Sequence, residues 1–440
     1  MTRTQPNRRL LLRCGVLLDG TGSAAREDVA LEVEGERIVS IKPGDGIHDE
    51  RSYVRDLRDC TVLPGLIDGH AHLSLRPELS GGLQLSPPAV WDDIAIVSWA
   101  LAAATAALCS GITTVVDLGS YSGLALRAGQ LIDAGLAVGP KVFASGAAIT
   151  TTAGHGAEFG RLADNGPELV KAVRAAVADG AHVIKIMVTG GSLDPASNRR
   201  RAQYSEDEMR AGISDAHRLG KRVIGHANAT EGIRAAVNAG IDIVAHCNWL
   251  SARTDSIEID MGTIEAMAER NVAIDLNIDG ALRDLRSDGV VEHWPFGGRE
   301  PRSRWELLQP LRSKGIPIYL TSDSFGPAIA GFTGELERAR SRWGLSAEEL
   351  VAMVTGAPAQ ALGLDADRGT LVPGNLADVV VVRGDLRMPS TSLAEPLAVY
   401  RSGREVVTEG LLHPPARSLD EPSGVHGAPP MVGVPLGRDR

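Results

Sequence analysis

The sequence predicts an α/β fold, a (β/α)8 TIM barrel with a small composite β-sandwich domain, and three observations lead to it. Eight short apolar segments alternate with stretches of helical periodicity between residues 60 and 365. Regular strand–helix repeats of this number are typical of a closed parallel barrel. Residues 8–62 and 370–411 instead alternate as short β elements with glycine turns. β-rich flanks on both sides of one barrel indicate a domain assembled from both ends of the chain.

The eight barrel strands are predicted where aliphatic and β-branched residues cluster between turn residues. They occupy 61–73, 112–119, 141–146, 182–191, 222–228, 241–249, 271–278 and 316–324. Helices are expected between them, among others over 167–180, 205–219 and 230–239. Ser205 and Glu208 stand in capping-box spacing at the start of one of these helices. The predicted units are the β-domain in two parts, 1–62 and 368–412, the barrel, 63–367, and a flexible tail, 413–440.

Composition limits the classes of partner. The chain has 440 residues and a net charge of −10, and this acidic balance argues against nucleic acid and membranes as partners. Four scattered cysteines without CxxC spacing suit reduced thiols in a cytoplasmic protein. The uncharged stretch 94–116 is long enough on paper to span a bilayer, but Gly111 divides it. We predict a buried helix, a turn and a strand there.

Polar residues stand near the ends of several predicted strands. His70 and His72 lie in "LIDGHAHL", and both imidazoles face the same side because strand side chains alternate. His226, His246 and Asp323 each stand in the later half of another strand. The carboxyl ends of barrel strands converge on one rim, where active sites occur. Imidazole and carboxylate are preferred ligands of Zn²⁺ and similar ions, so the sequence predicts a metal site at this rim.

A lysine in the fourth predicted strand needs its own explanation. Lys185 interrupts the apolar run "VIKIM", where desolvation of an ammonium is costly. Its position alternates in step with Val183 and Met187, so we expect it to point into the barrel. Burial favours the neutral amine, which can take up CO2 and become a carbamate. Such a group is anionic and has two oxygens, so it can bridge two metal ions.

These residues resemble the binuclear metal type of the amidohydrolase superfamily. The segment "VLPGLIDGHAHL", the strand-4 lysine, the strand-5 and strand-6 histidines and the strand-8 aspartate are similar to its metal-binding pattern. The closing "ALGLDADRGTLVPGNLADVVVV" is similar to the segment where that family returns to its β-domain. "IKIMVTGG" followed by "AQYSEDEMRAGISDAHRLGKRV" is especially similar to the prolidase-like branch. That branch includes Xaa-Pro and Xaa-Arg dipeptidases, N-acyl amino acid hydrolases and related pesticide and mycotoxin amidases.

The resemblance implies a role for each of these side chains. A first metal ion would be held by His70, His72 and Asp323. A second ion would be held by His226 and His246, with carboxylated Lys185 as the bridge between the two. Asp323 would also take the proton from a bridging hydroxide as it attacks the carbonyl, and then deliver this proton to the leaving nitrogen.

The implied enzyme is a metal-dependent hydrolase of a C–N bond in an N-acyl amino acid, a dipeptide or a related amide, carbamate or urea. Its implied cofactors are two divalent ions, Zn²⁺ first and Mn²⁺, Co²⁺ or Fe²⁺ after it, and CO2 as the lysine carbamate. The family also implies a small-molecule substrate and a homo-oligomer. Two alternatives stay open. One is a mononuclear deaminase or cyclic-amide hydrolase, although Ala229 replaces the glutamate usual in such deaminases. The other is a catalytically inactive scaffold.

Substrate contacts are harder to place because two motifs depart from the family pattern. "HANA" replaces the usual HAHG, so Asn228 stands where a second histidine is usual, and "AHCN" replaces EHG. A specialised substrate is therefore expected. The candidate substrate-binding residues are His155 in "TTAGHG", Tyr204, Asn228, Cys247, Asn248 and Trp249. Further candidates for a carboxylate site and an apolar pocket are Arg199, Arg200, Arg201, Trp294, Phe296 and Trp305.

Overall fold

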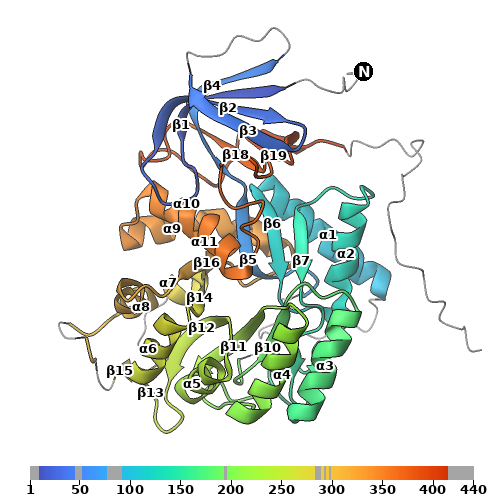
Figure 1. The fold of residues 1–440 in the computed structure, drawn as a ribbon, viewed down its shortest axis with the longest axis vertical. Coiled ribbons are helices and arrows are strands. Elements are labelled where there is room, and N and C mark those ends of the chain that lie inside the picture. Colours follow the sequence, from blue (N-terminus) through green and yellow to red (C-terminus); the bar gives the residue numbers. More distant parts are fainter. Residues whose placement is uncertain are drawn as a thin grey trace, which may run out of the picture.

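A computed structural model of the protein shows an α/β barrel with a β-sheet packed at one end (Figure 1). The structure describes residues 9–44, 52–76, 92–192, 196–282, 289–291, 294–296 and 299–414. The part of the predicted tail after residue 414 lies outside these described residues. The fold class is the predicted one.

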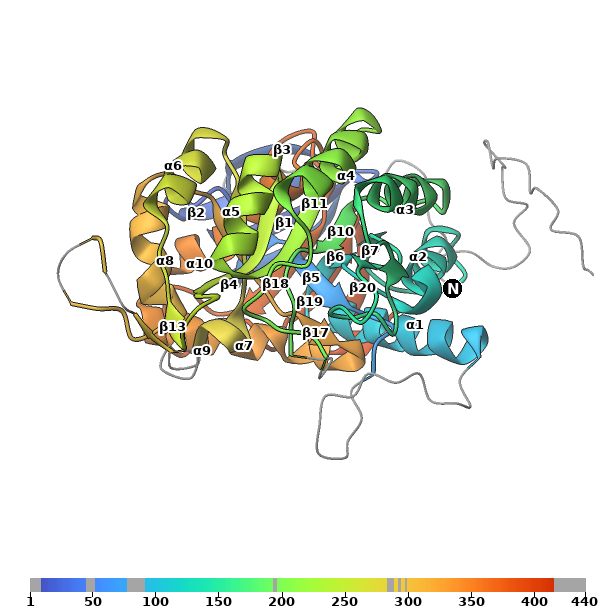
Figure 2. The ribbon, with the colours of Figure 1, turned by 90° about the horizontal axis from the view of Figure 1, so that it is seen from below.

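Every predicted barrel strand overlaps an observed one. These are β5 (Leu66–His72), β6 (Ile112–Asp117), β7 (Lys141–Ala144), β10 (Ile184–Met187), β11 (Val223–Ala229), β12 (Ile243–Leu250), β14 (Ala273–Asn277) and β16 (Ile318–Thr321). Each of these strands pairs in parallel with the next one in its sheet. One sheet contains β5, β6 and β7, and the other contains β10, β11, β12, β14 and β16. Two backbone hydrogen bonds connect these sheets, from His182 N to Ala144 O at 2.9 Å and from Asp323 N to His70 O at 2.8 Å. The strands therefore follow one another around a barrel (Figure 2).

Helices surround the strands (Figure 2). They are α1 (Asp93–Cys109), α2 (Leu124–Asp133), α3 (Gly166–Ala178), α4 (Glu206–Arg218), α5 (Thr230–Ala239), α6 (Met261–Glu269), α7 (Ile278–Leu282), α8 (Arg304–Ser313), α9 (Phe332–Trp343), α10 (Ala347–Met353) and α11 (Gly356–Leu362). The capping box of Ser205 and Glu208 is confirmed at the start of α4. The uncharged stretch forms α1, a turn and β6, as predicted. In the part of the chain that the structure describes, no helix is both long and apolar enough to cross a membrane.

The amino end of the barrel is filled with apolar side chains. Val183, Ile224, Ile243 and Tyr319 enter it from four strand starts and pack against Leu362 of α11. All five side chains are buried. The opposite, carboxyl end is left for the polar residues, which is the usual division of a barrel into a stabilising end and a functional end.

The two ends of the chain share one sheet. Its strand order is β21-β20-β19-β18-β4-β1-β2-β3, and β4 from the N-terminal flank pairs antiparallel with β18 from the C-terminal flank. The strands are β1 (Leu10–Leu17), β2 (Arg26–Glu34), β3 (Arg37–Pro43), β4 (Tyr53–Pro64), β18 (Val379–Arg383), β19 (Ala398–Arg401), β20 (Arg404–Thr408) and β21 (Leu411–Leu412). Val380 and Val382 join the main core, whereas Val379 and Val381 join a separate cluster on the other face.

Candidate metal centre

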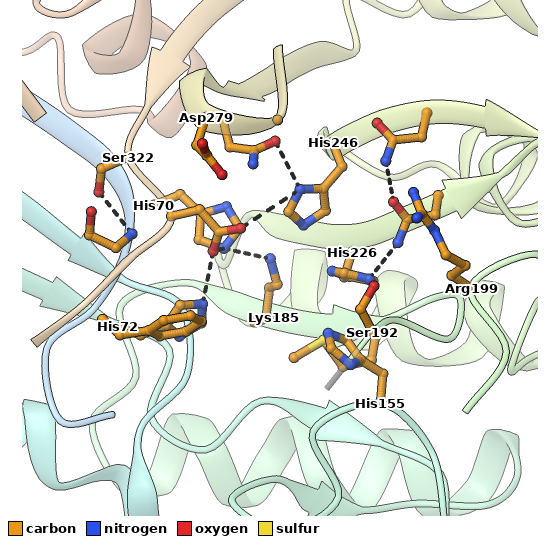
Figure 3. Close-up of a pocket in the computed structure, with 18 of the residues that line it drawn as sticks. His70, His72, His155, Lys185, Ser192, Arg199, His226, His246, Asp279 and Ser322 are labelled. Atoms are coloured by element: carbon orange, nitrogen blue, oxygen red, sulfur yellow. Dashed lines mark hydrogen bonds and ion pairs between the residues drawn. The ribbon is translucent and has the colours of Figure 1, made fainter. Parts of the chain in front are cut away.

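One cavity of about 560 Å³ opens at the carboxyl end of the barrel strands (Figure 3). The polar residues that the sequence predicted for a metal site all line it. They are His70 and His72 of β5, Lys185 of β10, His226 of β11, His246 of β12 and Asp323 after β16. Segments spread over more than half of the chain thus contribute side chains to a single site.

His70, His72 and Asp323 form the tightest group. Oδ1 of Asp323 lies 3.4 Å from Nε2 of His70 and 3.3 Å from Nε2 of His72. One ligand atom from each residue lies within 4.8 Å of the other two, a spacing that one metal ion can bridge. Burial alone would raise the pKa of Asp323, but the facing imidazoles of His70 and His72 hold it well below its usual range. The carboxylate is therefore ionised and can bind a cation.

The other ring nitrogens of both histidines are already engaged. Nδ1 of His70 lies 2.6 Å from Oδ2 of Asp275, and Nδ1 of His72 lies 3.0 Å from the carbonyl oxygen of Gly119. When each Nδ1 donates to its acceptor, the lone pair of each Nε2 is directed at the cavity. The donor set and its orientation therefore fit a divalent metal ion.

Asp275 is a residue of the site that the sequence analysis missed. It is buried in β14 and accepts a hydrogen bond from Oγ1 of Thr321 at 2.5 Å besides its contact with His70. Burial raises the pKa of this carboxyl, but His70, Lys185 and the hydrogen bond from Thr321 together lower it overall. The signal that could have revealed it is the same as for Lys185, a charged residue inside an apolar strand.

Lys185 points into the barrel, as its place in the strand predicted. Its side chain is 1% exposed, and its Nζ lies 3.3 Å from Nε2 of His70. Burial lowers the pKa of the amine to about 8, which leaves a fraction of it neutral at physiological pH. A neutral amine is the form that reacts with CO2, so the structure fits the predicted carbamate.

His226 and His246 lie on the other side of Lys185 (Figure 3). Their ring centroids are 4.5 Å apart, and Nδ1 of His246 lies 3.9 Å from Oδ2 of Asp323. Burial lowers the pKa of His246 to about 4 and holds that of His226 well below its usual range. Both imidazoles are therefore neutral, as metal ligands must be.

The backbone near the site departs from regular strand geometry. His246, Cys247, Trp249 and Asp323 have positive φ angles of 68°, 52°, 53° and 53°. Non-glycine residues pay conformational energy for this region, and such residues cluster at functional sites. Ala245 packs inside the barrel, so simple alternation would turn His246 and Asn248 outwards. The irregular backbone instead lets both residues line the cavity.

Three predicted substrate contacts are wrong. Tyr204, Cys247 and Trp249 are buried in the main hydrophobic core rather than along the cavity. Tyr204 lies just before the N-cap of α4, and its hydroxyl donates a hydrogen bond to the carbonyl oxygen of Ala163 at 2.8 Å. The irregular end of β12 turns Cys247 and Trp249 away from the substrate side.

The remaining rim candidates divide in the same way. His155, Asn228 and Asn248 line the cavity. Of the three consecutive arginines, only Arg199 lines the cavity. Arg200 instead donates to the backbone carbonyls of Ser251, Thr254 and Ser256. Arg201 lies near Glu231. The predicted aromatic pocket is instead core packing: Trp294, Phe296 and Trp305 contact the main cluster, and Trp305 stacks on Trp343.

Comparison with known proteins identifies the family. A model described as "Amidohydrolase family" matches residues 61–408. The chain belongs to the amidohydrolase family. This amidohydrolase is 26% identical to the ochratoxinase of Aspergillus niger over 425 residues, which cover 88% of this chain and 84% of the relative. A Xaa-Pro dipeptidase crystal structure with bound methionine has a TM-score of 0.75 at 24% identity and covers 90% of this chain and 99% of that one. A molinate hydrolase structure has a TM-score of 0.72 at 20% identity, with 98% and 99% covered.

Membership settles the general class of reaction. The amidohydrolase is a hydrolase that acts on C–N bonds, and the superfamily generally uses metal ions. The two solved structures are less than 25% identical to this chain and support its fold. In this amidohydrolase the cluster of His70, His72 and Asp323 is the place where a metal ion could bind.

Proposed function

We propose that the protein is a metal-dependent hydrolase of small amides, with an N-acyl amino acid or dipeptide as substrate and carbamates and ureas as related targets. The observation that carries this proposal is the convergence in one cavity of two oriented imidazoles, an ionised carboxylate and a buried amine. The similarity to proteins named ochratoxinase, Xaa-Pro dipeptidase and molinate hydrolase supports the same class.

The proposed centre would hold two ions. His70, His72 and Asp323 would hold the first, and His226 and His246 the second. The carbamate of Lys185, formed when its amine adds CO2 and releases a proton, would supply an oxygen to each. Imidazole and carboxylate donors favour Zn²⁺, and Mn²⁺, Co²⁺ and Fe²⁺ accept the same ligands. A bound divalent ion lowers the pKa of its water from about 15.7 towards 7 and polarises a carbonyl.

The chain itself supplies proton transfer and orientation. Asp323 would accept the proton of the attacking water and return it to the leaving nitrogen, because its carboxylate lines the cavity beside the other proposed ligands. Asp275 and the Gly119 carbonyl hold the rings of His70 and His72 in one orientation. Phe159 and Phe325 lie along the same cavity and keep its wall beside His72 apolar.

The test is a substrate screen with metal-quantified protein in bicarbonate buffer, over N-acyl amino acids, dipeptides, carbamates and aryl ureas. We expect cleavage of a C–N bond in at least one class and loss of this activity when a chelator removes the metal. Lys185→Ala should lose activity at least about 1000-fold and bind less metal. Lys171→Ala, at an exposed lysine of α3, is the matched control and should keep both. Full activity and metal content in Lys185→Ala would contradict the proposal.

A further inference from the structure

One wall of the cavity is a chain of hydrogen-bonded polar side chains. Nδ2 of Asn248 donates to Oδ1 of Asn228 at 2.5 Å, and Nδ2 of Asn228 lies 2.8 Å from Nε2 of His226. His226 in turn packs against His246, which approaches Asp323. The wall therefore begins at the metal-binding group and runs away from it along the ends of β11 and β12. Neither Asn228 nor Asn248 is needed to hold the proposed ions.

The backbone fixes which way these amides point. Nδ2 of Asn228 also donates to the carbonyl oxygen of Gly190 at 3.3 Å, and a carbonyl accepts only a donor. Oδ1 of Asn228 must then face Asn248, and Asn248 must present its Nδ2 to it. This leaves Oδ1 of Asn248, a residue that lines the cavity, buried and with no hydrogen-bond partner among the described residues.

An unpartnered acceptor in such a place points to a ligand. Asn248 is 8% exposed, and leaving a buried polar atom unsatisfied is costly. Nδ1 of His155 is a second buried atom of this kind, and its ring lies 4.3 Å from that of His226. A neutral imidazole ring offers one donor and one acceptor nitrogen.

Arg199 adds a positive charge at the same side of the cavity. Figure 3 shows Arg199 and Ser192 beside His226, and His72 and Ser322 on the opposite side. Of the three consecutive arginines Arg199 lines the cavity, whereas Arg200 and Arg201 contact groups outside it. A guanidinium matches the geometry of a carboxylate, which it binds with paired hydrogen bonds. The wall thus offers an acceptor for an N–H group and a donor for an anion.

We propose that Asn248 and Arg199 are the residues that recognise the amine half of the substrate, with the substrate N–H donating to Oδ1 of Asn248 and a carboxylate accepting from Arg199. His155 forms a hydrogen bond with the same half of the substrate, as donor or as acceptor. This inference rests on the proposed amide hydrolysis and narrows its substrates to acylated α-amino acids with a secondary amide. Tertiary amides, such as acylated proline, lack the N–H and bind poorly.

The experiment compares three forms of the best-cleaved N-acyl amino acid: the parent, its α-carboxamide and its N-methyl derivative. In the wild type both changes should lower kcat/KM about 10- to 100-fold. Arg199→Gln should abolish the preference for the carboxylate while the preference for N–H remains. Asn248→Leu should abolish the preference for N–H while the preference for the carboxylate remains. Arg201→Gln is the matched control in the same loop and should change neither preference.

Binding is measured separately by titrating metal-loaded protein with the N-acyl amino acid and with its carboxamide. The inference is supported if the carboxylate form binds more tightly than the carboxamide and Arg199→Gln loses this difference. If that result is obtained but no amide is cleaved, only the proposed function fails. Cleavage with preferences that survive in Arg199→Gln and Asn248→Leu overturns the inference and leaves the proposed function intact. Arg304 is the other arginine that lines the cavity. The inference is also overturned if Arg304→Gln loses the carboxylate preference while Arg199→Gln keeps it.

Discussion

At the scale of single residues, the contact between Asp275 and His70 shows how a side chain that does not line the cavity can control one that does. Nδ1 of His70 contacts Asp275 at 2.6 Å, and Nε2 of the same ring lies within 3.4 Å of both Lys185 and Asp323. The charge of Asp275 makes the imidazole a better donor and fixes the ring. The carboxylate is therefore part of the site although no ligand atom of it reaches the cavity wall.

Replacing this carboxylate tests the point. Asp275→Asn keeps the size of the side chain but removes its charge, and we expect metal affinity about 10- to 100-fold weaker together with lower activity. Competition with a coloured chelator measures the affinity. Asp207→Asn, at an exposed aspartate of α4, is the control and should leave affinity unchanged. Unchanged metal affinity in Asp275→Asn would show that His70 does not depend on its partner.

The sequence was sufficient to predict those residues of the cavity whose direction follows from the alternation of side chains along a strand. Lys185 sits in a regularly paired strand, and His70 and His72 are two residues apart in β5, so their directions could be derived from their spacing. His246 was placed at the rim correctly, but the wall around it was not, because positive φ angles at Cys247 and Trp249 depend on tertiary packing. Asp275 was missed because its partner, His70, is 205 residues away along the chain.

At the scale of elements, helix pairs around the barrel are joined by ion pairs as well as apolar contacts. Asp215 of α4 accepts from Arg174 of α3 at 2.9 Å and from Arg218 one turn along at 2.8 Å. Hydrogen bonds from Arg174 lower the pKa of Asp215 to about 2. Both arginines are more than half exposed, so solvent screens much of the attraction.

The pKa shift predicts a pH dependence of stability. A carboxyl with a lowered folded-state pKa stabilises the fold above its unfolded pKa of about 3.9, and this contribution is lost as pH falls towards about 2. Asp215→Asn should therefore lower the free energy of unfolding at pH 7 by about 1 kcal/mol, with a smaller difference from wild type below pH 4. Urea denaturation at both pH values measures this. A difference that grows on acidification would contradict the assignment.

The same scale explains what the sequence could tell about elements. Strands and helices of the barrel were predictable because apolar periodicity and caps are local signals, as in the capping box at Ser205. The separate eight-stranded sheet needed pairing between β4 and β18, more than 300 residues apart. Composition and turns suggested that pairing, but its register came from the structure.

At the scale of the whole molecule, β18 connects the sheet to the barrel. Val380 packs into the main core and lies against Gly111, whose added Cβ would meet it at 3.2 Å. The next residue, Val381, belongs to the cluster on the opposite face of the sheet. One strand thus holds together two cores that the chain builds from distant segments.

A charge in this strand should destabilise both parts. Val380→Asp buries an unpaired carboxyl, and we expect a loss of at least about 3–5 kcal/mol in unfolding free energy or no soluble folded protein. Thermal unfolding followed by circular dichroism gives the answer. Val39→Asp, at an exposed valine of β3, is the control and should change stability by less than about 1 kcal/mol. Equal stability of the two variants would contradict the burial of Val380 between the sheet and the barrel.

The hydrogen bond from Asp323 to His70 has a consequence for how the protein matures in the cell. A ribosome adds about 5–20 residues per second, so roughly 10–50 s separate the synthesis of the first histidines from that of the aspartate. During this interval the nascent chain carries exposed imidazoles but no finished pocket. Cations captured early would be held loosely and exchanged, and tight loading waits until the last barrel strand has been translated and has docked beside the first.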